Sequence, residues 1–359
     1  MKNIGLYIHI PFCKSVCPYC DFYRFRATDE KKEEYVYALI REIKDYGDKF
    51  SDKIVDTIYF GGGTPTVLPP KLFAALIKAV RESFKISKDV EFTVEANPST
   101  DVEALLPILV DGGVNRISFG MQSAVDSERR QLGRLSGTKR VTECVELISK
   151  SGIENISLDL MIGIPNQTSD SLSESLAYIK EIGVPHVSAY MLKLEEGTYF
   201  YRNADKLMLP SDDETADLYL QMCEFFDNIG LKQYEISNFA KPSFESKHNL
   251  KYWHCEEYLG IGCAAHSYID GKRFYYDRDI DAFIASCEPH LDTLGGDFNE
   301  RLMLALRLTE GYVGELPERV IKKASSPIYK NLLVLDDKGI HLTRKGMLVS
   351  NEIISRLMD

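Results

Sequence analysis

The first 195 residues alternate short apolar runs with longer amphipathic stretches. The short runs are typical of buried strands, and the stretches between them place apolar residues at helical spacing, as Val36, Leu39 and Ile43 do. The predicted strands cover residues 5–10, 55–60, 91–96, 115–121, 155–164 and 186–192. The predicted helices cover residues 30–46, 70–84, 101–111, 126–150 and 169–182, and Ser169 is the expected N-cap of the last helix.

Six strand–helix units in succession predict a parallel sheet, because a helix between two strands lets the second strand run in the same direction as the first. These crossovers are expected to be right-handed. No reversal signal interrupts the six units, so the pattern favours a partial (β/α)6 barrel, open at one side, over a flat doubly wound sheet. The predicted fold class is therefore α/β, with this partial barrel as the main domain.

The pattern changes after the sixth unit. Residues 241–295 are rich in aromatic, glycine and polar residues and show no clear period. The elements predicted around them are a helix over 211–229, a strand-like run over 233–240, a helix over 297–315, and a strand, turn and helix over 341–358. The expected parts of the chain are the barrel domain at 1–240, a connecting segment at 241–295 and a small α-rich C-terminal domain at 296–359.

The composition is that of an ordinary globular protein of 359 residues, 44% of them hydrophobic and 27% charged. No apolar run approaches the ~20 residues of a membrane span. The start of the chain is too short and too polar for a secretion signal, so we expect a cytoplasmic protein. The net charge of −11 argues against a general nucleic-acid partner, because proteins that bind nucleic acids usually present a basic face.

Three of the eight cysteines form one short motif, Cys13-x3-Cys17-x2-Cys20, directly after the first predicted strand. Cysteine thiolates hold iron–sulfur clusters, usually four to a cluster. Three thiolates would leave one iron open to a ligand, as catalytic metal sites do. A zinc site with His9 as fourth ligand is the alternative. It is less favoured because structural zinc sites usually combine two pairs of ligands.

Polar residues or glycines follow each of the six predicted strands. Ligands of parallel β/α folds bind at the C-terminal ends of the strands, so these positions are expected to line one cavity. Glycines let backbone N–H groups approach a ligand closely. The carboxylate of Glu95 can accept hydrogen bonds from an ammonium or from ribose hydroxyls, unless an internal ion pair occupies it. Beyond the cysteine motif, the residues at the strand ends are Gly61, Gly62, Gly63, Thr64, Glu95, Asn97, Gln122, Ser123, Asp159, Gly163, Lys193 and Glu195.

The cysteine motif and the run Gly61-Gly62-Gly63-Thr64-Pro65 together resemble the signature of the radical S-adenosylmethionine (SAM) superfamily. Within it, the chain is similar to the oxygen-independent coproporphyrinogen III oxidase group. The resemblance covers nearly the whole chain and implies the partial barrel and a C-terminal domain like that of the group, which is short here. The segments that carry the narrower resemblance are 7–13, 19–22, 95–98, 120–123 and 159–165.

Three features distinguish the two branches of this group, the true oxidases and the heme chaperones. The oxidases have a fourth cysteine where this chain has Phe22, and they carry an extension ahead of the motif that begins here at Tyr7. The chaperones have phenylalanine at that position and an H-N-x-x-Y-W motif linked to heme binding, which matches residues 248–253. The resemblance favours the heme-chaperone branch. A radical SAM coproporphyrinogen III oxidase of porphyrin biosynthesis is the alternative.

The resemblance implies three ligands, namely a [4Fe–4S] cluster, SAM and heme. Cys13, Cys17 and Cys20 would ligate the cluster. His248 is the candidate ligand of heme iron, since a proximal histidine is common there, and His254, Cys255 and His266 are nearby alternatives. The other heme residues would be Asn249, Tyr252 and Trp253. The residues implied to contact SAM are Tyr7, Tyr19, Gly62, Gly63, Thr64, Glu95, Gln122, Arg134 and Asp159.

The two branches imply different chemistry on the same scaffold. In the superfamily the cluster passes one electron to the sulfonium of SAM and cleaves it to methionine and a 5′-deoxyadenosyl radical, while the protein orients the reactants and excludes water. The oxidase would use that radical to start decarboxylation of propionate side chains. The chaperone branch implies heme or another tetrapyrrole as ligand, an acceptor hemoprotein as partner, peripheral contact with membrane hemoproteins, and a monomer or homodimer.

Overall fold

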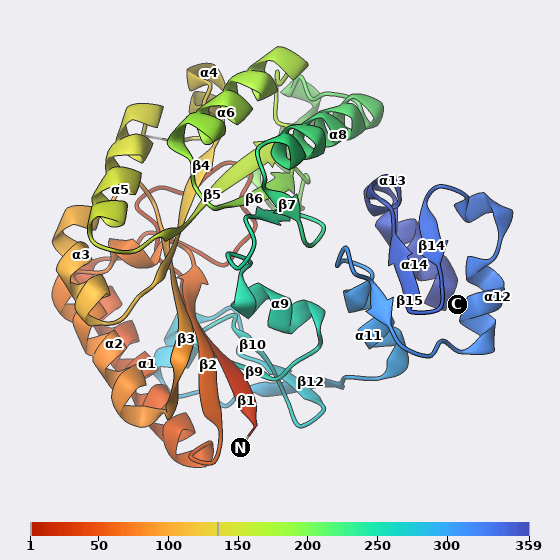
Figure 1. Ribbon diagram of the computed structural model, residues 1–359. Coiled ribbons are helices and arrows are strands. Elements are labelled where there is room, and N and C mark those ends of the chain that lie inside the picture. Colours follow the sequence, from red (N-terminus) through yellow and green to blue (C-terminus); the bar gives the residue numbers. More distant parts are fainter. Residues whose placement is uncertain (1, 135, 359) are drawn as a thin grey trace.

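The computed structural model describes residues 2–134 and 136–358. Within these residues the main body is a 12-stranded curved sheet, and six parallel strands at its centre lie in sequence order (Figure 1). This confirms the predicted α/β fold with strand–helix units. The sheet is open, because its edge strands β12 and β7 lie at opposite ends of the strand order. The central strands are β1 (Asn3–Ile10), β2 (Ile54–Gly62), β3 (Ile86–Ala96), β4 (Arg116–Gln122), β5 (Asn155–Ile162) and β6 (His186–Met191).

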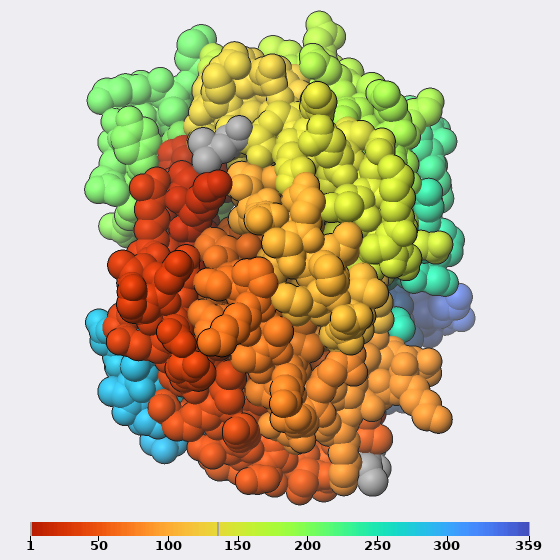
Figure 2. Space-filling view, turned by 90° about the vertical axis from the view of Figure 1, so that its left-hand side faces the viewer, coloured from red at the N-terminus to blue at the C-terminus, as the bar shows by residue number. Residues whose placement is uncertain are grey.

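Helices from the first half of the chain cover the outer, convex face of this sheet, as the ribbon and the continuous red-to-yellow surface show (Figures 1 and 2). The N-cap of the last of them is Thr168, which forms a capping box with Ser171, so the prediction of Ser169 as N-cap was wrong by one residue. These helices are α1 (Asp29–Lys49), α2 (Pro70–Ser83), α3 (Val102–Asp111), α4 (Asp126–Gln131), α5 (Thr138–Lys150) and α6 (Ser169–Ile182).

The single helix predicted over 126–150 is wrong, because the chain leaves the helical path between α4 and α5. Gly133 adopts a left-handed conformation with φ of 68°, which residues other than glycine rarely adopt. A Cβ atom at this position would lie 3.0 Å from Cδ of Pro18, in the cysteine loop. The break therefore brings Arg134 close to that loop.

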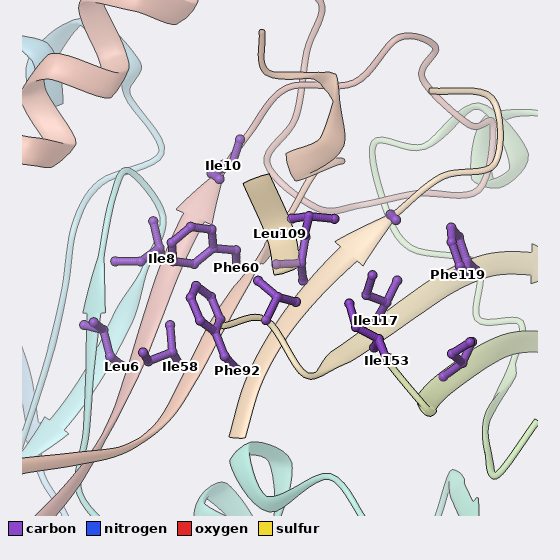
Figure 3. Packing of buried hydrophobic residues seen from close by; sticks show 14 of the residues in the cluster. Leu6, Ile8, Ile10, Ile58, Phe60, Phe92, Leu109, Ile117, Phe119 and Ile153 are labelled. Atoms are coloured by element: carbon purple, nitrogen blue, oxygen red, sulfur yellow. The ribbon is translucent and has the colours of Figure 1, made fainter. Parts of the chain in front are cut away.

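Successive side chains of each central strand point to opposite faces of the sheet. On β1, Leu6, Ile8 and Ile10 are fully buried and pack with Ile58 and Phe60 of β2 beneath the outer helices (Figure 3). The alternate residues of the strands face the inside of the curved sheet, and most of them are polar. The inward-facing residues include Tyr7, His9, Thr57, Tyr59, Glu91, Glu95, Arg116, Ser118, Asp159, Ser188 and Tyr190.

Residues 241–295, expected to connect two domains, extend the central sheet. β9 (Tyr258–Ile261) pairs in parallel with β1, and Leu259 and Ile261 share the main core. The antiparallel strands β10 (His266–Ile269), β11 (Lys272–Tyr275) and β12 (His290–Leu294) continue the sheet outward. The helices of this segment are α9 (Lys247–Trp253) and α10 (Ile280–Ile284).

Two short strands form the opposite edge of the sheet. Next to β6 come β8 (Asn238–Ala240) and β7 (Lys232–Gln233), which follow α7 (Tyr199–Arg202) and α8 (Asp212–Asn228). No helix in the described part of the chain combines the length and the apolar character that a membrane span requires.

The C-terminal part packs around a second hydrophobic core, separate from that of the main sheet. The helix predicted over 297–315 is wrong beyond Ala305, because the chain turns there into a small antiparallel sheet. An ion pair of 2.7 Å between Arg344 and Asp227 ties this part to α8. Its elements are α11 (Phe298–Ala305), β13 (Tyr312–Val313), α12 (Glu318–Ala324), β14 (Leu333–Leu335), β15 (Gly339–Leu342), α13 (Arg344–Leu348) and α14 (Ser350–Met358).

Candidate functional site

A cavity of about 360 Å³ lies inside the curved sheet at the C-terminal ends of the central strands. Most of the residues predicted at the strand ends line it, as expected for a parallel β/α fold. Ser123 and Gly163 turn away, since the Ser123 hydroxyl donates to Glu128 at 2.6 Å and the Gly163 N–H donates to Gln167 at 2.7 Å. The cavity is lined by residues of all six central strands or of the loops that follow them.

The cysteine loop between β1 and α1 forms one wall of this cavity. Cys13, Cys17 and Cys20 are all free thiols, and all three line the cavity. No group of three His, Cys, Asp or Glu residues within 2–134 and 136–358 is arranged to hold a single metal ion. Sulfur atoms that share one zinc ion lie about 4 Å apart, because each Zn–S bond is about 2.3 Å long. A zinc site with His9 as fourth ligand is not favoured, because both ring nitrogens of His9 already have hydrogen-bond partners.

Burial and a neighbouring positive charge act in opposite directions on the pKa values of two of the three thiols. Burial raises the pKa of the Cys13 thiol to about 11 and also raises the pKa of the Cys20 thiol. The nearby charge of Arg24 acts in the opposite direction on both pKa values. The guanidiniums of Arg24 and Arg134 line the same cavity, and the Nε atom of each is buried without a hydrogen-bond partner. The charge of Arg24 therefore favours the thiolate forms of Cys13 and Cys20.

Glu95 lies at the end of β3, on the side of the cavity that faces the glycine run. Its carboxylate accepts hydrogen bonds from the Tyr59 hydroxyl at 2.8 Å and from the Gly62 N–H at 3.1 Å. Burial raises the pKa of this carboxyl to about 7, although the two hydrogen bonds act in the opposite direction. A Cβ atom at Gly61 would lie 3.0 Å from the carboxylate, so the glycine leaves room for Glu95.

Asp159 on β5 is a second buried carboxylate of the cavity. The Ser118 hydroxyl donates to it at 3.1 Å. Burial raises the pKa of Asp159 to about 6, although this hydrogen bond and the charges of Arg134 and Arg116 favour the ionised form. Arg116 is itself 1% exposed, and its Nε atom has no partner. The inner face thus holds carboxylates and guanidiniums in a small, poorly hydrated volume, where charges interact strongly.

Arg134 connects the cysteine loop to the opposite wall. Its guanidinium donates a hydrogen bond to the hydroxyl of Tyr19 and lies 5.9 Å from the centre of that ring. A Cβ atom at Gly120 would lie 3.1 Å from both the Arg134 guanidinium and the Gln122 side-chain amide. Gly120 therefore allows these two side chains to approach the strand closely.

The helix α9, which carries the H-N-x-x-Y-W motif, closes the inside of the curved sheet. Glu91 on β3 accepts hydrogen bonds from the N–H groups of Lys247 and His248, both at 3.0 Å, at the first turn of the helix. His248 is completely buried, with Nδ1 2.8 Å from the Thr57 hydroxyl and Nε2 2.8 Å from the Tyr252 hydroxyl. Burial lowers the pKa of this imidazole to about 3.

With this geometry in place, comparisons with known proteins identify the family. The model of the radical SAM superfamily matches residues 7–179. Heme chaperone HemW of Lactococcus lactis subsp. lactis (strain IL1403) is 34% identical, over 99% of this chain and 98% of that protein. Heme chaperone HemW of Bacillus subtilis (strain 168) is 36% identical, over 98% of both chains. The chain belongs to the HemW family.

A solved structure agrees with the fold of this chain. Coproporphyrinogen III oxidase HemN from Escherichia coli superposes with a TM-score of 0.85, over 99% of this chain and 90% of HemN. The sequence identity of 22% makes this a similarity of fold. Membership of the radical SAM superfamily implies a [4Fe–4S] cluster and SAM. The three free thiols of the cavity, with the Arg24 charge that favours thiolates at Cys13 and Cys20, fit such a cluster.

The structure brings together most of the residues that the sequence predicted for the site. Of the positions expected to contact SAM, all except Tyr7 line the cavity of the cysteines. Tyr7 lines a neighbouring cavity, where its hydroxyl is 3.0 Å from Nδ1 of His9. Sequence reasoning did not name five polar cavity residues that belong to the central strands themselves. The alternation of polar and apolar positions signals all five, which are Tyr59, Arg116, Ser118, Ser188 and Tyr190.

The heme residues expected in the HemW motif lie in different places. Asn249 lines the cavity of the cysteines, and Tyr252 lines the neighbouring cavity. Trp253 ends α9 and lies half-buried. His248 as a ligand of heme iron stays a prediction, but the geometry does not favour it, because both ring nitrogens already have partners.

Proposed function

We propose that this protein is a heme chaperone that binds a [4Fe–4S] cluster, SAM and heme and delivers the heme to an acceptor hemoprotein. The observation that carries the proposal is similarity over nearly the full chain to proteins named heme chaperone HemW, with 34% and 36% identity. Phe22 supports it, since this residue stands where the oxidases resembled by the sequence have a further thiol.

In this proposal Cys13, Cys17 and Cys20, which line the cavity, would hold the cluster. A reduced cluster can pass one electron to the sulfonium of bound SAM. The protein itself binds and orients the ligand. Glu95 and Asp159 supply carboxylates to a ligand that carries positive charge, and the donors of Arg134 and Gln122 face the same volume.

Heme transfer tests the proposal directly. The anaerobically reconstituted protein is loaded with heme and mixed with a b-type apohemoprotein, and the Soret band of the acceptor is followed over time. We expect transfer that is faster than from an equal concentration of heme on serum albumin. Failure of the protein to bind heme, or transfer no faster than from albumin, would contradict the proposal.

Cysteine variants test the part that the cluster plays. Cys17→Ala removes a proposed ligand, whereas Cys287→Ala changes a half-buried cysteine that does not line the cavity. We expect iron and sulfide content to fall only in the first variant. The alternative function has its own assay, in which the reconstituted protein is incubated with coproporphyrinogen III, SAM and a reductant. Formation of protoporphyrinogen at enzyme-like turnover would show an oxidase.

A further inference from the structure

A second cavity of about 340 Å³ lies beside the first, between β1, the cysteine loop and the strands of residues 258–275. Its volume falls in the range of small-molecule sites, about 300–1,000 Å³. Phe22, Gly62 and Glu95 line both cavities, so a ligand in the second would lie next to the cysteines' cavity. The tyrosine side chains that line the second cavity are Tyr7, Tyr23, Tyr252 and Tyr258. Aromatic walls of this kind favour a flat, apolar ligand.

Two imidazoles line this cavity, and they differ in what their ring nitrogens contact. Both ring nitrogens of His9 already have partners, because Nδ1 lies 3.0 Å from the Tyr7 hydroxyl and Nε2 lies 3.2 Å from the backbone oxygen of Tyr23. His266 is exposed at the start of β10, and its ring makes no hydrogen bond or ion pair with any residue in 2–134 or 136–358. A neutral imidazole ring binds metals through such a free nitrogen.

Neighbouring strands fix the direction of the His266 ring. His266 pairs with Tyr275 across β10 and β11, and the two rings stack with centres 5.4 Å apart and planes at 26°. Tyr275 in turn pairs with His290 on β12, whose Nε2 lies 2.8 Å from the Asp277 carboxylate. The contact with Asp277 keeps His290 outside the second cavity. His266 lines that cavity and offers it a ring nitrogen with no other partner.

A positive charge completes the site. Arg278 lines the second cavity and is exposed, and it forms no ion pair or hydrogen bond with another residue of the described ranges. Guanidiniums bind carboxylates through paired, charge-assisted hydrogen bonds. Aromatic walls, one free imidazole and one free guanidinium match a planar metallated macrocycle that carries carboxylates.

We propose that this second cavity is the heme site, with His266 as axial ligand of the iron, the tyrosine rings as walls and Arg278 bound to a propionate. The inference rests on the proposed function and goes further by placing the ligand. His248 then acts as a buried brace of α9 that holds Tyr252 against the cavity. Heme in this position would share the wall of Phe22 and Glu95 with the cysteine cavity.

Titration of the full-length protein with hemin, followed through the Soret band, tests the axial ligand. His266→Ala is compared with His290→Ala, the matched control on the same sheet whose ring lies outside the cavity. We expect His266→Ala to lower hemin affinity at least about tenfold, because loss of a residue that only orients a metal ligand already costs about 10- to 100-fold, and we expect added imidazole to restore the ligated spectrum. His290→Ala should keep the wild-type affinity and spectrum.

A ligand exchange separates coordination from a structural role. His266→Cys should still bind hemin but shift the Soret band and the electron paramagnetic resonance signal to those of a thiolate ligand, which no structural effect produces. Wild-type hemin binding with an unchanged spectrum in both His266 variants would overturn the inference. So would loss of the ligated spectrum in folded His248→Ala alone. Absence of hemin binding by the wild-type protein would instead overturn the proposed function, so the two failures are distinguishable.

Arg278 has a separate test. The wild-type protein should bind hemin more tightly than hemin dimethyl ester, which lacks the carboxylate charges. Arg278→Ala should abolish this preference, and Arg278→Lys should restore part of it. Equal discrimination by the wild-type protein and Arg278→Ala would overturn the assignment of the propionate contact.

Discussion

The hydroxyl of Thr57 lies 2.8 Å from Nδ1 of His248, and this contact joins α9 to the inner face of β2. Both residues are at most 2% exposed, so water cannot replace either partner. His248→Ala removes a buried ring and leaves the hydroxyls of Thr57 and Tyr252 without it. We expect the free energy of unfolding to fall by about 2–4 kcal/mol, the cost of buried polar groups left unpaired together with lost packing.

Anaerobic urea unfolding measures this effect. His290→Ala serves as the control, because His290 is exposed and a surface substitution of this kind changes stability by about 0.5 kcal/mol or less. A His248→Ala protein as stable as the wild type would show that His248 does not brace α9.

The two buried carboxylates predict a pH dependence of SAM affinity. The pKa of Glu95 is raised to about 7 and that of Asp159 to about 6, so both groups are protonated at pH 5.5 and both are ionised at pH 8. SAM carries positive charge on its sulfonium and ammonium, and it therefore binds the ionised carboxylates more tightly. Affinity should rise as pH increases through 6 and 7, by up to about tenfold per pH unit for each group.

Calorimetric titration with SAM at pH 6 and pH 8, on the reconstituted protein, checks the sign. Glu95→Gln should flatten the dependence, leaving the part due to Asp159. Glu103→Gln, which changes a carboxylate paired with Arg140 on the surface, should keep the wild-type profile. Equal affinity of the wild-type protein at both pH values would contradict the prediction.

Much of the site could be predicted because it lies at strand ends. Glu95 and Asp159 lie at or near the C-terminal ends of β3 and β5. The spacing of apolar residues predicted the ends of these two strands to within a few residues. Tyr59 and Arg116 were missed because their strands looked uniformly buried, and only the polar alternation distinguishes the inner face from the outer.

The features that local residue spacing did not predict depend on contacts between residues far apart in the sequence. The break near Gly133 depends on the approach of Pro18, which is more than 100 residues earlier in the chain. The strand that begins at Tyr258 pairs in parallel with β1, from the opposite end of the sequence, and its local pattern carries no sign of this partner. The burial of His248 was not predicted for the same reason, because its partner Thr57 lies far away in the sequence, on β2.

Arg134 is expected to act on SAM and not on the cluster. Its guanidinium lines the cavity with one unpartnered nitrogen, so Arg134→Ala removes a donor that faces the ligand. A hydrogen bond to a charged group contributes about 1.5–3 kcal/mol, which corresponds to a roughly 10- to 100-fold loss of SAM affinity. Iron and sulfide content should stay at wild-type levels.

Arg140→Ala is the matched control for this variant, because the Arg140 guanidinium pairs with Glu103 at 2.6 Å outside the cavity. Its SAM affinity should equal that of the wild type. The prediction fails if Arg134→Ala binds SAM normally, or if it loses the cluster together with SAM.

Gly133 and Gly183 offer a pair of positions that separates backbone strain from contact with the cysteine loop. Both are left-handed, with φ of 68° and 71°, so alanine costs about 1–2 kcal/mol of strain at either position. At Gly183 the added Cβ meets nothing within 4 Å, whereas at Gly133 it lies 3.0 Å from Pro18. Gly133→Ala should therefore displace the loop that carries Cys17 and lower cluster content after reconstitution. Gly183→Ala should lose similar stability and keep its cluster. Iron content and the free energy of unfolding are measured for both variants. Equal iron content at similar stability would show that the contact with Pro18 does not position the cysteines.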